Sequence, residues 1–289
     1  MIIQIRRLKG AFEMLNLGMV SRSLSSFTPE ECADRMAHSG FRCTELCFTF
    51  QGLDCWHYNG CADLSALTPQ KAAAIVQLFR ARGIDVVSVG AFSNLMEPDQ
   101  DACEANFRYF ERCIEIAADN GIPFVATENG FIPGKRGVQT DSFESDFIKF
   151  RERMTRLSDL AAQHGVSIAF EPCVLDLTPS AKRTRDFIRQ VQRNNLRVLL
   201  DPANLIANSD ESDMFRYLAP YVAYFHGKDR HVNDTYGCNL GDGEIDWVTF
   251  FRLYHEQTDN VPFILEYVNS TNCDAVRDRA MAFDRQAQA

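Results

Sequence analysis

Four apolar stretches in the second half of the chain each end at a residue that could bind a cation or carry a proton. The stretches cover residues 166–170, 196–200, 222–225 and 262–265, and the residues that follow them are Glu171, Asp201, His226 and Glu266. Taken singly, such residues at strand ends are more often solvated or paired with an arginine. Three carboxylates that meet at one point, however, raise one another's pKa values unless a cation lies among them. Three carboxylates and one imidazole suit Mn²⁺ best, with Mg²⁺, Co²⁺, Fe²⁺ and Zn²⁺ as alternatives.

The segment after the third stretch is the most polar of these strand ends. His226 and Gly227 are followed by Lys228, Asp229 and Arg230, so four ionisable groups fall within five positions. So many charged side chains are not expected within a buried strand. They are typical of the rim of a barrel, where side chains converge on one pocket. Lys228 could hold a substrate oxygen or a developing charge, or it could form a salt bridge with Asp229. The sequence leaves both alternatives open.

Alternating strand and helix patterns supply the frame for these residues. Apolar runs predict strands at 14–20, 41–50, 84–89, 122–127, 166–170, 196–200, 222–225 and 262–268. Between them, amphipathic patterns predict helices at 28–38, 68–83, 99–120, 142–164, 185–193, 214–218, 247–257 and 274–285. Thr28 and Thr68, each followed by a proline, are typical of helix starts. Repeated strand–helix units predict an α/β fold with a parallel sheet, and eight of them predict a closed (β/α)8 barrel, or TIM barrel.

An open, doubly wound sheet is the alternative fold. It would normally show a glycine-rich phosphate turn after its first strand, and Gly18 stands alone there. We therefore expect a single barrel domain at 14–289, which matches the roughly 250 residues that such a barrel needs. Residues 1–13 are mildly basic and lack the apolar core of a signal peptide, so we expect a short N-terminal extension.

Composition disfavours several classes of function. The net charge of −9 over 289 residues disfavours nucleic acid or an anionic membrane as the main partner. No apolar run approaches the roughly 18 residues that a membrane span needs. The ten cysteines include no Cys-x-x-Cys pair. Because the chain is large and shows no secretory apolar region, we expect reduced thiols rather than a disulfide framework, and a cytoplasmic protein. The oligomeric state stays open, with a homo-oligomer as one alternative.

Five motifs resemble those of the xylose-isomerase-like barrel superfamily of sugar isomerases and epimerases, above all its ketose 3-epimerase and inosose dehydratase branches. They are Ala-Phe-Glu171-Pro, Leu-Leu-Asp201-Pro-Ala-Asn204, His226-Gly-Lys228-Asp229, Gly241-Asp-Gly243-Glu-Ile-Asp246 and Ile-Leu-Glu266-Tyr. The resemblance covers nearly the whole chain and is most specific from residue 168 onward. It implies that the four strand-end residues bind one divalent metal ion, and that Glu171 and Glu266 are also the catalytic acid–base pair.

Further positions are expected to contact the substrate. The epimerases usually carry a histidine where this chain has Asn204, and their substrate-binding arginine follows the metal-binding histidine at a longer spacing than Arg230 does. Asn204, Lys228 and Arg230 are therefore expected at the substrate, while these departures leave the identity of the sugar open. Trp56 and His57, in the loop 51–67, are expected there as well, since aromatic faces pack on sugars; anchoring of the loop is the alternative.

The expected function is that of a divalent-metal-dependent isomerase or epimerase of a ketose or keto-polyol, working through an enediolate. One glutamate would remove the proton next to the carbonyl and the other would return a proton to the opposite face. With a leaving hydroxyl β to the carbonyl, the same site would eliminate water, so an inosose-dehydratase-type lyase is the first alternative. A lyase subunit that needs a partner chain and a barrel that only binds a polyol are the others.

Overall fold

Eight strands form the centre of the molecule in this computed structural model, which describes residues 14–132, 134–135 and 137–289. They are β1 (Leu17–Met19), β2 (Cys43–Leu46), β5 (Asp85–Gly90), β6 (Phe124–Thr127), β7 (Ser167–Phe170), β8 (Leu196–Leu200), β9 (Val222–Gly227) and β10 (Phe263–Leu265). All pair in parallel and close in the order β1-β10-β9-β8-β7-β6-β5-β2. The predicted α/β fold, a single (β/α)8 barrel, is confirmed. The predicted extension at 1–13 lies outside the described residues.

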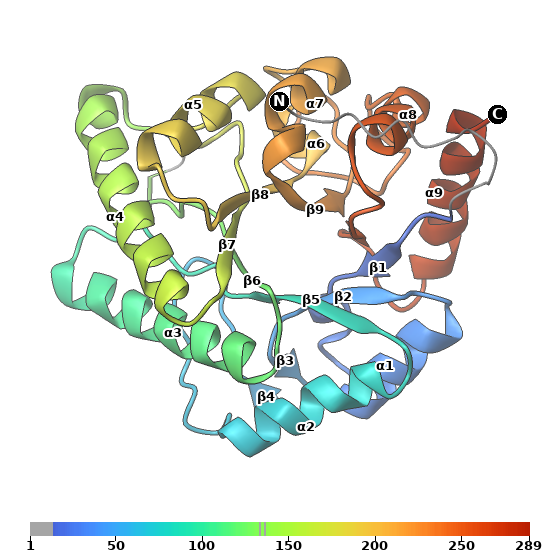
Figure 1. The fold of residues 1–289 in the computed structure, drawn as a ribbon, viewed down its shortest axis with the longest axis horizontal. Coiled ribbons are helices and arrows are strands. Elements are labelled where there is room, and N and C mark those ends of the chain that lie inside the picture. The colour runs from blue at the N-terminus through green and yellow to red at the C-terminus, as the bar shows by residue number, and fades with distance from the viewer. Residues whose placement is uncertain (1–13, 133, 136) are drawn as a thin grey trace.

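Helices surround this barrel (Figure 1). The α-helices are α1 (Pro29–His38), α2 (Pro69–Arg80), α3 (Gln100–Asp119), α4 (Phe143–Gln163), α5 (Ala181–Val191), α6 (Pro202–Leu205), α7 (Glu211–Leu218), α8 (Trp247–Gln257) and α9 (Cys273–Ala287). Short 3-10 turns lie at η1 (Ser21–Leu24), η2 (Thr140–Ser142) and η3 (Ala219–Tyr221). The predicted helix starts are confirmed, because the hydroxyls of Thr28 and Thr68 accept hydrogen bonds from the backbone three residues on.

The predicted strand at 41–50 is wrong in its length. β2 ends at Leu46, and residues Thr49–Phe50 form β3, which pairs antiparallel with β4 (Leu53–Asp54) outside the barrel. The break occurs at Cys47, whose backbone N–H donates to the hydroxyl of Ser21 at 2.8 Å. That hydroxyl donates in turn to the Cys47 carbonyl at 3.1 Å. The chain therefore leaves the barrel beside η1 and continues into the loop that carries Trp56.

Other boundaries shift by a few residues. Helices α5 and α7 begin before the predicted residues 185 and 214. The side chains of Ser180 and Asp210 cap them by accepting hydrogen bonds from the backbone of the first turn. The last strand ends at Leu265 rather than at 268, because Tyr267 has φ of 57° and so lies outside the β region.

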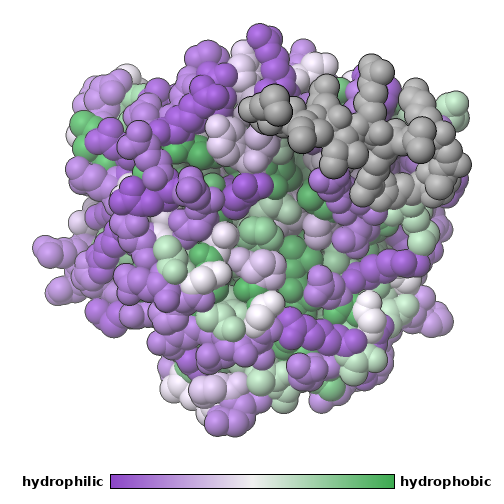
Figure 2. Space-filling model, viewed as in Figure 1, coloured by the Kyte–Doolittle hydropathy of each residue, from purple (hydrophilic) through white to green (hydrophobic). Residues whose placement is uncertain are grey.

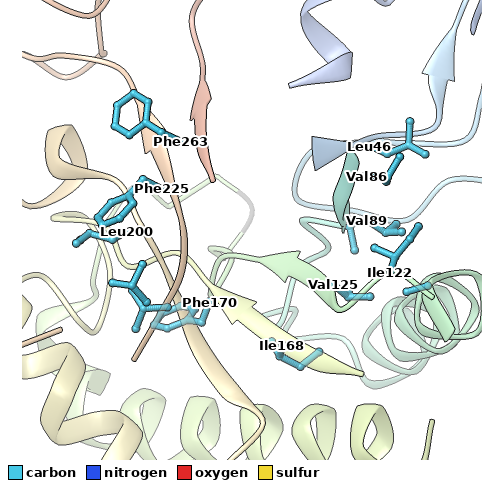
Figure 3. Packing of buried hydrophobic residues seen from close by; sticks show 14 of the residues in the cluster. Leu46, Val86, Val89, Ile122, Val125, Ile168, Phe170, Leu200, Phe225 and Phe263 are labelled. Atoms are coloured by element: carbon cyan, nitrogen blue, oxygen red, sulfur yellow. The ribbon is translucent and has the colours of Figure 1, made fainter. Parts of the chain in front are cut away.

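Apolar side chains fill two layers, one on each side of the barrel wall. Outward-facing residues such as Ile168 and Phe170 pack against the helices, and Figure 3 shows part of this layer. The Phe170 ring lies 5.4 Å from that of Phe150 on α4. The interior holds a smaller set: Val20, Cys43, Val87, Phe92, Ala126, Ala169, Leu199, Ala223, Tyr224 and Ile264.

The periphery of the face seen in Figure 2 is mostly hydrophilic, and hydrophobic residues gather toward its centre. This distribution agrees with helices whose outer faces meet water and whose inner faces cover the barrel. Among the described residues, no helix is both long enough and apolar enough to cross a membrane.

Candidate metal centre

Strand alternation explains why the four predicted ligands point to one place. Residues two apart in a strand face the same side, and Ala169 of β7 faces the barrel interior. Glu171, two residues later, faces the interior at the carboxyl end of the strand. The same step of two leads from the interior residues Leu199, Tyr224 and Ile264 to Asp201, His226 and Glu266.

The four side chains meet at the carboxyl ends of their strands, where all are buried. Their ligand atoms lie within 4.8 Å of one another. His226 Nδ1 is 3.3 Å from Glu171 Oε1 and 3.5 Å from Glu266 Oε1. The structure thus brings together every residue that the sequence predicts as a metal ligand.

Lys228 reaches into the same cluster. Its Nζ lies 2.6 Å from Asp201 Oδ2, 2.8 Å from Glu266 Oε2 and 3.7 Å from Glu171 Oε1. The side chain is buried apart from a small fraction. The ammonium group therefore acts as a counter-charge for three of the four predicted ligands.

The alternative salt bridge between Lys228 and Asp229 is wrong, because Asp229 is engaged elsewhere. Its Oδ2 accepts a hydrogen bond from Trp247 Nε1 at 2.7 Å. The turn 241–246 folds directly onto this carboxylate, since a Cβ at Gly243 would collide with Asp229 Oδ1. Asp229 therefore anchors the loop after β9 and leaves Lys228 free to turn inward.

Glu45 on β2 contacts the ring nitrogen of His226 that faces away from the other three predicted ligands. His226 Nε2 is 3.2 Å from Glu45 Oε2, which also accepts a hydrogen bond from Tyr224 Oη at 2.6 Å. The Nδ1 atom is thereby directed at Glu171 and Glu266. A carboxylate behind a metal-binding histidine sets its tautomer and its orientation. From the sequence, Glu45 is a candidate rim residue within a predicted strand, with no role assigned to it.

Arg22, in η1, is a site residue that the sequence analysis missed. Its Nη1 donates to Glu45 Oε1 at 2.9 Å, and its Nη2 donates to Glu266 Oε1. The guanidinium carbon lies 5.5 Å from the Trp56 ring centroid and 5.2 Å from that of Phe92. An arginine in a polar loop after the first strand is too common a feature to indicate this role.

The loop 51–67 places Trp56 and His57 beside Arg22. The two residues line a shallow depression there, together with Tyr58. Trp56 packs on the guanidinium, and its buried Nε1 has no hydrogen-bond partner. His57 is exposed. Their contact with a substrate stays a prediction, and Trp56 Nε1 is the polar atom that a ligand in this depression could satisfy.

A larger cavity, of about 550 Å³, opens next to the cluster. Asn204, Lys228 and Arg230, all predicted to bind substrate, line it. Asn204 Nδ2 donates to Glu171 Oε1 at 2.8 Å, and Arg230 Nη2 donates to Asn204 Oδ1 at 3.5 Å. Arg230 Nε is buried without a partner. The cavity therefore has donors at its inner end, which suits a polyhydroxylated ligand.

Three further carboxylates line the same cavity, and two of them, Glu128 and Asp176, have raised pKa values. Tyr58 Oη donates to Glu128 Oε2 at 2.6 Å. Burial and the charge of Glu171 raise the pKa of Glu128 to about 7, against the effect of the Tyr58 hydrogen bond. Burial and the charge of Glu128 raise the pKa of Asp176 well above its ordinary range. Glu128 can therefore hold a proton near neutral pH, a property that its position at a strand end did not reveal.

The charges of the cluster come close to balance when His226 is protonated. Burial disfavours the ionised form of Glu171, but Lys228 and His226 hold its pKa at about 2. Burial also disfavours the imidazolium, yet Glu45 and Glu171 raise the pKa of His226 to about 9. Protonated His226, Lys228 and Arg22 are thus the counter-charges that the carboxylates have without a bound metal ion.

The donor set fits a divalent cation. Asp201 Oδ2 is buried, and the Lys228 ammonium at 2.6 Å is the one partner seen for this atom among the described residues. A buried carboxylate needs such a counter-charge, and a divalent cation could supply it in place of the ammonium. Oxygen-rich sets with one imidazole suit Mn²⁺ and similar ions. Binding would require a neutral His226 and a Lys228 side chain turned away from the carboxylates.

Comparison with known proteins identifies a matching family model and solved structures with the same fold. A family model described as xylose isomerase-like TIM barrel matches residues 33–287. The D-psicose 3-epimerase from Clostridium cellulolyticum H10, solved with D-tagatose, is 17% identical with a TM-score of 0.68, over 95% of this chain and 96% of that chain. A search of curated proteins found no match.

Two further solved structures have the same fold. The 3-keto-D-glucoside 4-epimerase from E. coli is 13% identical with a TM-score of 0.71, over 94% of this chain and 99% of that chain. The IolI protein with a bound zinc atom is 14% identical with a TM-score of 0.71, over 94% of this chain and 96% of that chain. At these identities the likeness shows the fold alone.

Proposed function

The chain belongs to the xylose isomerase-like TIM barrel family, and on that premise we propose that it is a divalent-metal-dependent isomerase or epimerase of a ketose or keto-polyol. The observation that carries this proposal is the buried cluster at the ends of β7, β8, β9 and β10, with its ligand atoms within 4.8 Å of one another. Two of its members, Glu171 and Glu266, are carboxylates that can also carry protons. Proteins of the same fold that are titled as sugar epimerases support the same class.

The two glutamates are the proposed proton carriers. Glu171 is ionised at neutral pH because its pKa is held at about 2, so it can act as a base. Glu266 lies on the other side of the centre, since β8 and β9 separate β10 from β7 in the barrel. One glutamate would take the proton next to the carbonyl and the other would return a proton to the opposite face, which inverts that carbon. Each positioned acid or base contributes roughly 10²–10⁴-fold.

The surrounding residues would orient these carboxylates. Arg22 and Lys228 hold Glu266, and Asn204 holds Glu171. A divalent ion at the four ligands, for which we propose Mn²⁺, would supply Lewis-acid stabilisation of the negative charge that develops on the substrate oxygens. Lys228, once turned toward the cavity that it lines, would hold a substrate oxygen with its ammonium group.

A dehydratase is the second candidate, and Glu128 is the observation that favours it. Its carboxyl lines the cavity, and with a pKa of about 7 it is partly protonated at neutral pH. If the substrate carries a hydroxyl β to the carbonyl, removal of the α-proton expels that hydroxyl, and Glu128 can give the departing oxygen its proton. An epimerase needs no such third group.

The test is a panel of ketoses and inososes incubated in D₂O with the Mn²⁺-loaded protein and followed by NMR. An epimerase incorporates deuterium next to the carbonyl and inverts the carbon. A dehydratase forms an unsaturated product, and Glu128→Gln should slow that product more than it slows deuterium exchange. A protein that only binds polyols does neither. Exchange that requires an added partner chain would identify a partner-dependent lyase, whereas no exchange with any of these substrates would refute the proposal.

A further inference from the structure

The cavity next to the metal centre is bordered by exposed apolar side chains. Nine large hydrophobic side chains are exposed among the described residues, and six of them line this one cavity. We name these six the apolar collar: Tyr58, Phe131, Val138, Leu175, Tyr236 and Tyr267. Isolated exposed apolar residues are ordinary, but a group of them around one cavity marks a binding surface.

Part of the collar is held in place by contacts within the loops. The rings of Tyr58 and Phe131 lie 6.3 Å apart. The Asn59 side chain fixes this pair, because its Oδ1 accepts a hydrogen bond from the Phe131 backbone at 3.1 Å. Its Nδ2 donates to the Phe131 carbonyl at 3.5 Å. This wall of the cavity is therefore formed before a ligand arrives.

Tyr267 connects the collar with the metal centre. It directly follows Glu266 and has φ of 57°, a region that residues other than glycine rarely adopt. In this conformation its ring lies 5.6 Å from Lys228 Nζ and borders the cavity. The apolar collar thus borders a cavity whose lining residue Lys228 contacts the proton-carrying cluster.

An unsubstituted ketose would leave much of this apolar surface uncovered. One face of a sugar can pack on an aromatic ring, but its hydroxyls lose hydrogen bonds with water where apolar side chains surround the sugar on several sides. Three of the polar residues that line the cavity lie next to the cluster, because Asn204 and Lys228 contact its carboxylates and Arg230 contacts Asn204. The volume of about 550 Å³ falls in the range of roughly 300–1,000 Å³ that holds drug-sized ligands.

We propose that the substrate is a keto sugar that carries an apolar substituent, an aromatic or alkyl group joined through a glycosidic oxygen. The sugar would lie on the polar inner end and the substituent within the collar. This inference rests on the proposed function for the sugar and adds the substituent. A ligand is favoured over a second copy of the chain, because the collar surrounds a concave cavity that is also lined by Lys228 and Asn204, which contact the predicted metal ligands.

Calorimetric titration of the Mn²⁺-loaded protein tests the substituent directly. The methyl and phenyl β-glycosides of one keto sugar differ only in the group at the glycosidic oxygen, and the phenyl form should bind at least about tenfold more tightly. Leu175→Ser and Tyr236→Ser should bring this ratio toward one. Ile148→Ser, a matched change at an exposed residue of α4 outside the cavity, should leave it unchanged.

Equal affinity for the two glycosides would overturn the proposal, and so would no detectable binding of the phenyl form at millimolar concentration. Collar variants that dissociate an oligomer in sedimentation without changing the ratio would assign the collar to a subunit interface instead. Binding requires no turnover, so this result is separate from deuterium exchange. A preference for the phenyl form without deuterium exchange would refute the proposed isomerase and support the apolar subsite. Deuterium exchange without this preference would support the isomerase and refute the subsite.

Discussion

Replacing Lys228 with methionine should tighten the binding of a divalent metal ion. The ammonium group lies 2.6 Å from Asp201 Oδ2 and 2.8 Å from Glu266 Oε2, so a metal ion has to displace it from both carboxylates. Methionine has a similar length and no charge. The variant therefore keeps the packing of the side chain and removes the competing cation.

The size of this effect follows from the ion pairs that the metal ion must break. Removing one partner from a buried ion pair costs roughly 3–5 kcal/mol. Lys228 need not lose all of that energy, because it also lines the cavity and can turn toward water. We therefore expect a net competition of about 1.4–2.8 kcal/mol, which is a tightening of about tenfold to a hundredfold. The metal-free variant should melt at a lower temperature, since the buried carboxylates lose a counter-charge.

The assay is calorimetric titration of chelator-stripped protein with Mn²⁺ in the presence of a weak competing chelator. Lys135→Met is the matched control, because Lys135 also lines the cavity and no ion pair is seen for it among the described residues. It should leave the Kd unchanged. A Kd for Lys228→Met that equals or exceeds the wild-type value would refute the reasoning, since the lysine would then support the metal ion rather than compete with it.

Glu171→Gln and Glu266→Gln should each lower turnover by at least about 10²-fold, because each removes a proton carrier, while Glu104→Gln on the surface should not. Near-normal turnover with the metal content retained would exclude these two as the acid–base pair. Metal affinity should rise with pH, since the pKa of His226 is raised from 6.5 to about 9 and its proton must leave when the metal ion binds. Titrations between pH 7 and 9 should show the Kd falling about tenfold per pH unit, and a flat profile would remove His226 from the ligands. The free energy of unfolding of the metal-free protein should instead fall as the pH rises. The stabilisation by the imidazolium of His226 is complete below pH 6.5 and is lost as the pH rises through about 9. Phe225→Ala should lower the free energy of unfolding by about 3–5 kcal/mol in chemical denaturation, as its fully buried ring packs against α8; a loss below about 1 kcal/mol would contradict this packing.

The ligand cluster was predictable because strand periodicity is short-range information. Each ligand follows an interior apolar residue by two positions, as Glu266 follows Ile264, and parallel strands in a barrel bring such ends together. Eight strand–helix units were likewise readable from apolar runs and helix caps. The lengths of the strands were harder to predict, because the end of β2 depends on the hydroxyl of Ser21, a contact across 26 residues.

The remaining site residues depend on how the barrel closes. Arg22 lies 244 residues from Glu266 in sequence, and the two meet only because β1 pairs with β10, with Met19 opposite Leu265. The partner of Lys228 was equally hidden. Its long side chain could reach either Asp229 or the carboxylates across the barrel mouth, and the choice was settled by the hydrogen bonds that occupy Asp229.

Metal content per chain tests the central claim most directly, because the account requires the four strand-end residues to form one metal site. After equilibration with Mn²⁺ and removal of free ion, elemental analysis should find about one ion per chain in the wild type. Asp201→Ala combined with His226→Ala should lose it, while Lys135→Met keeps it. Chelation of the wild type should also lower its melting temperature. A wild-type protein without bound metal, or a double variant that still holds one ion per chain, would contradict the account.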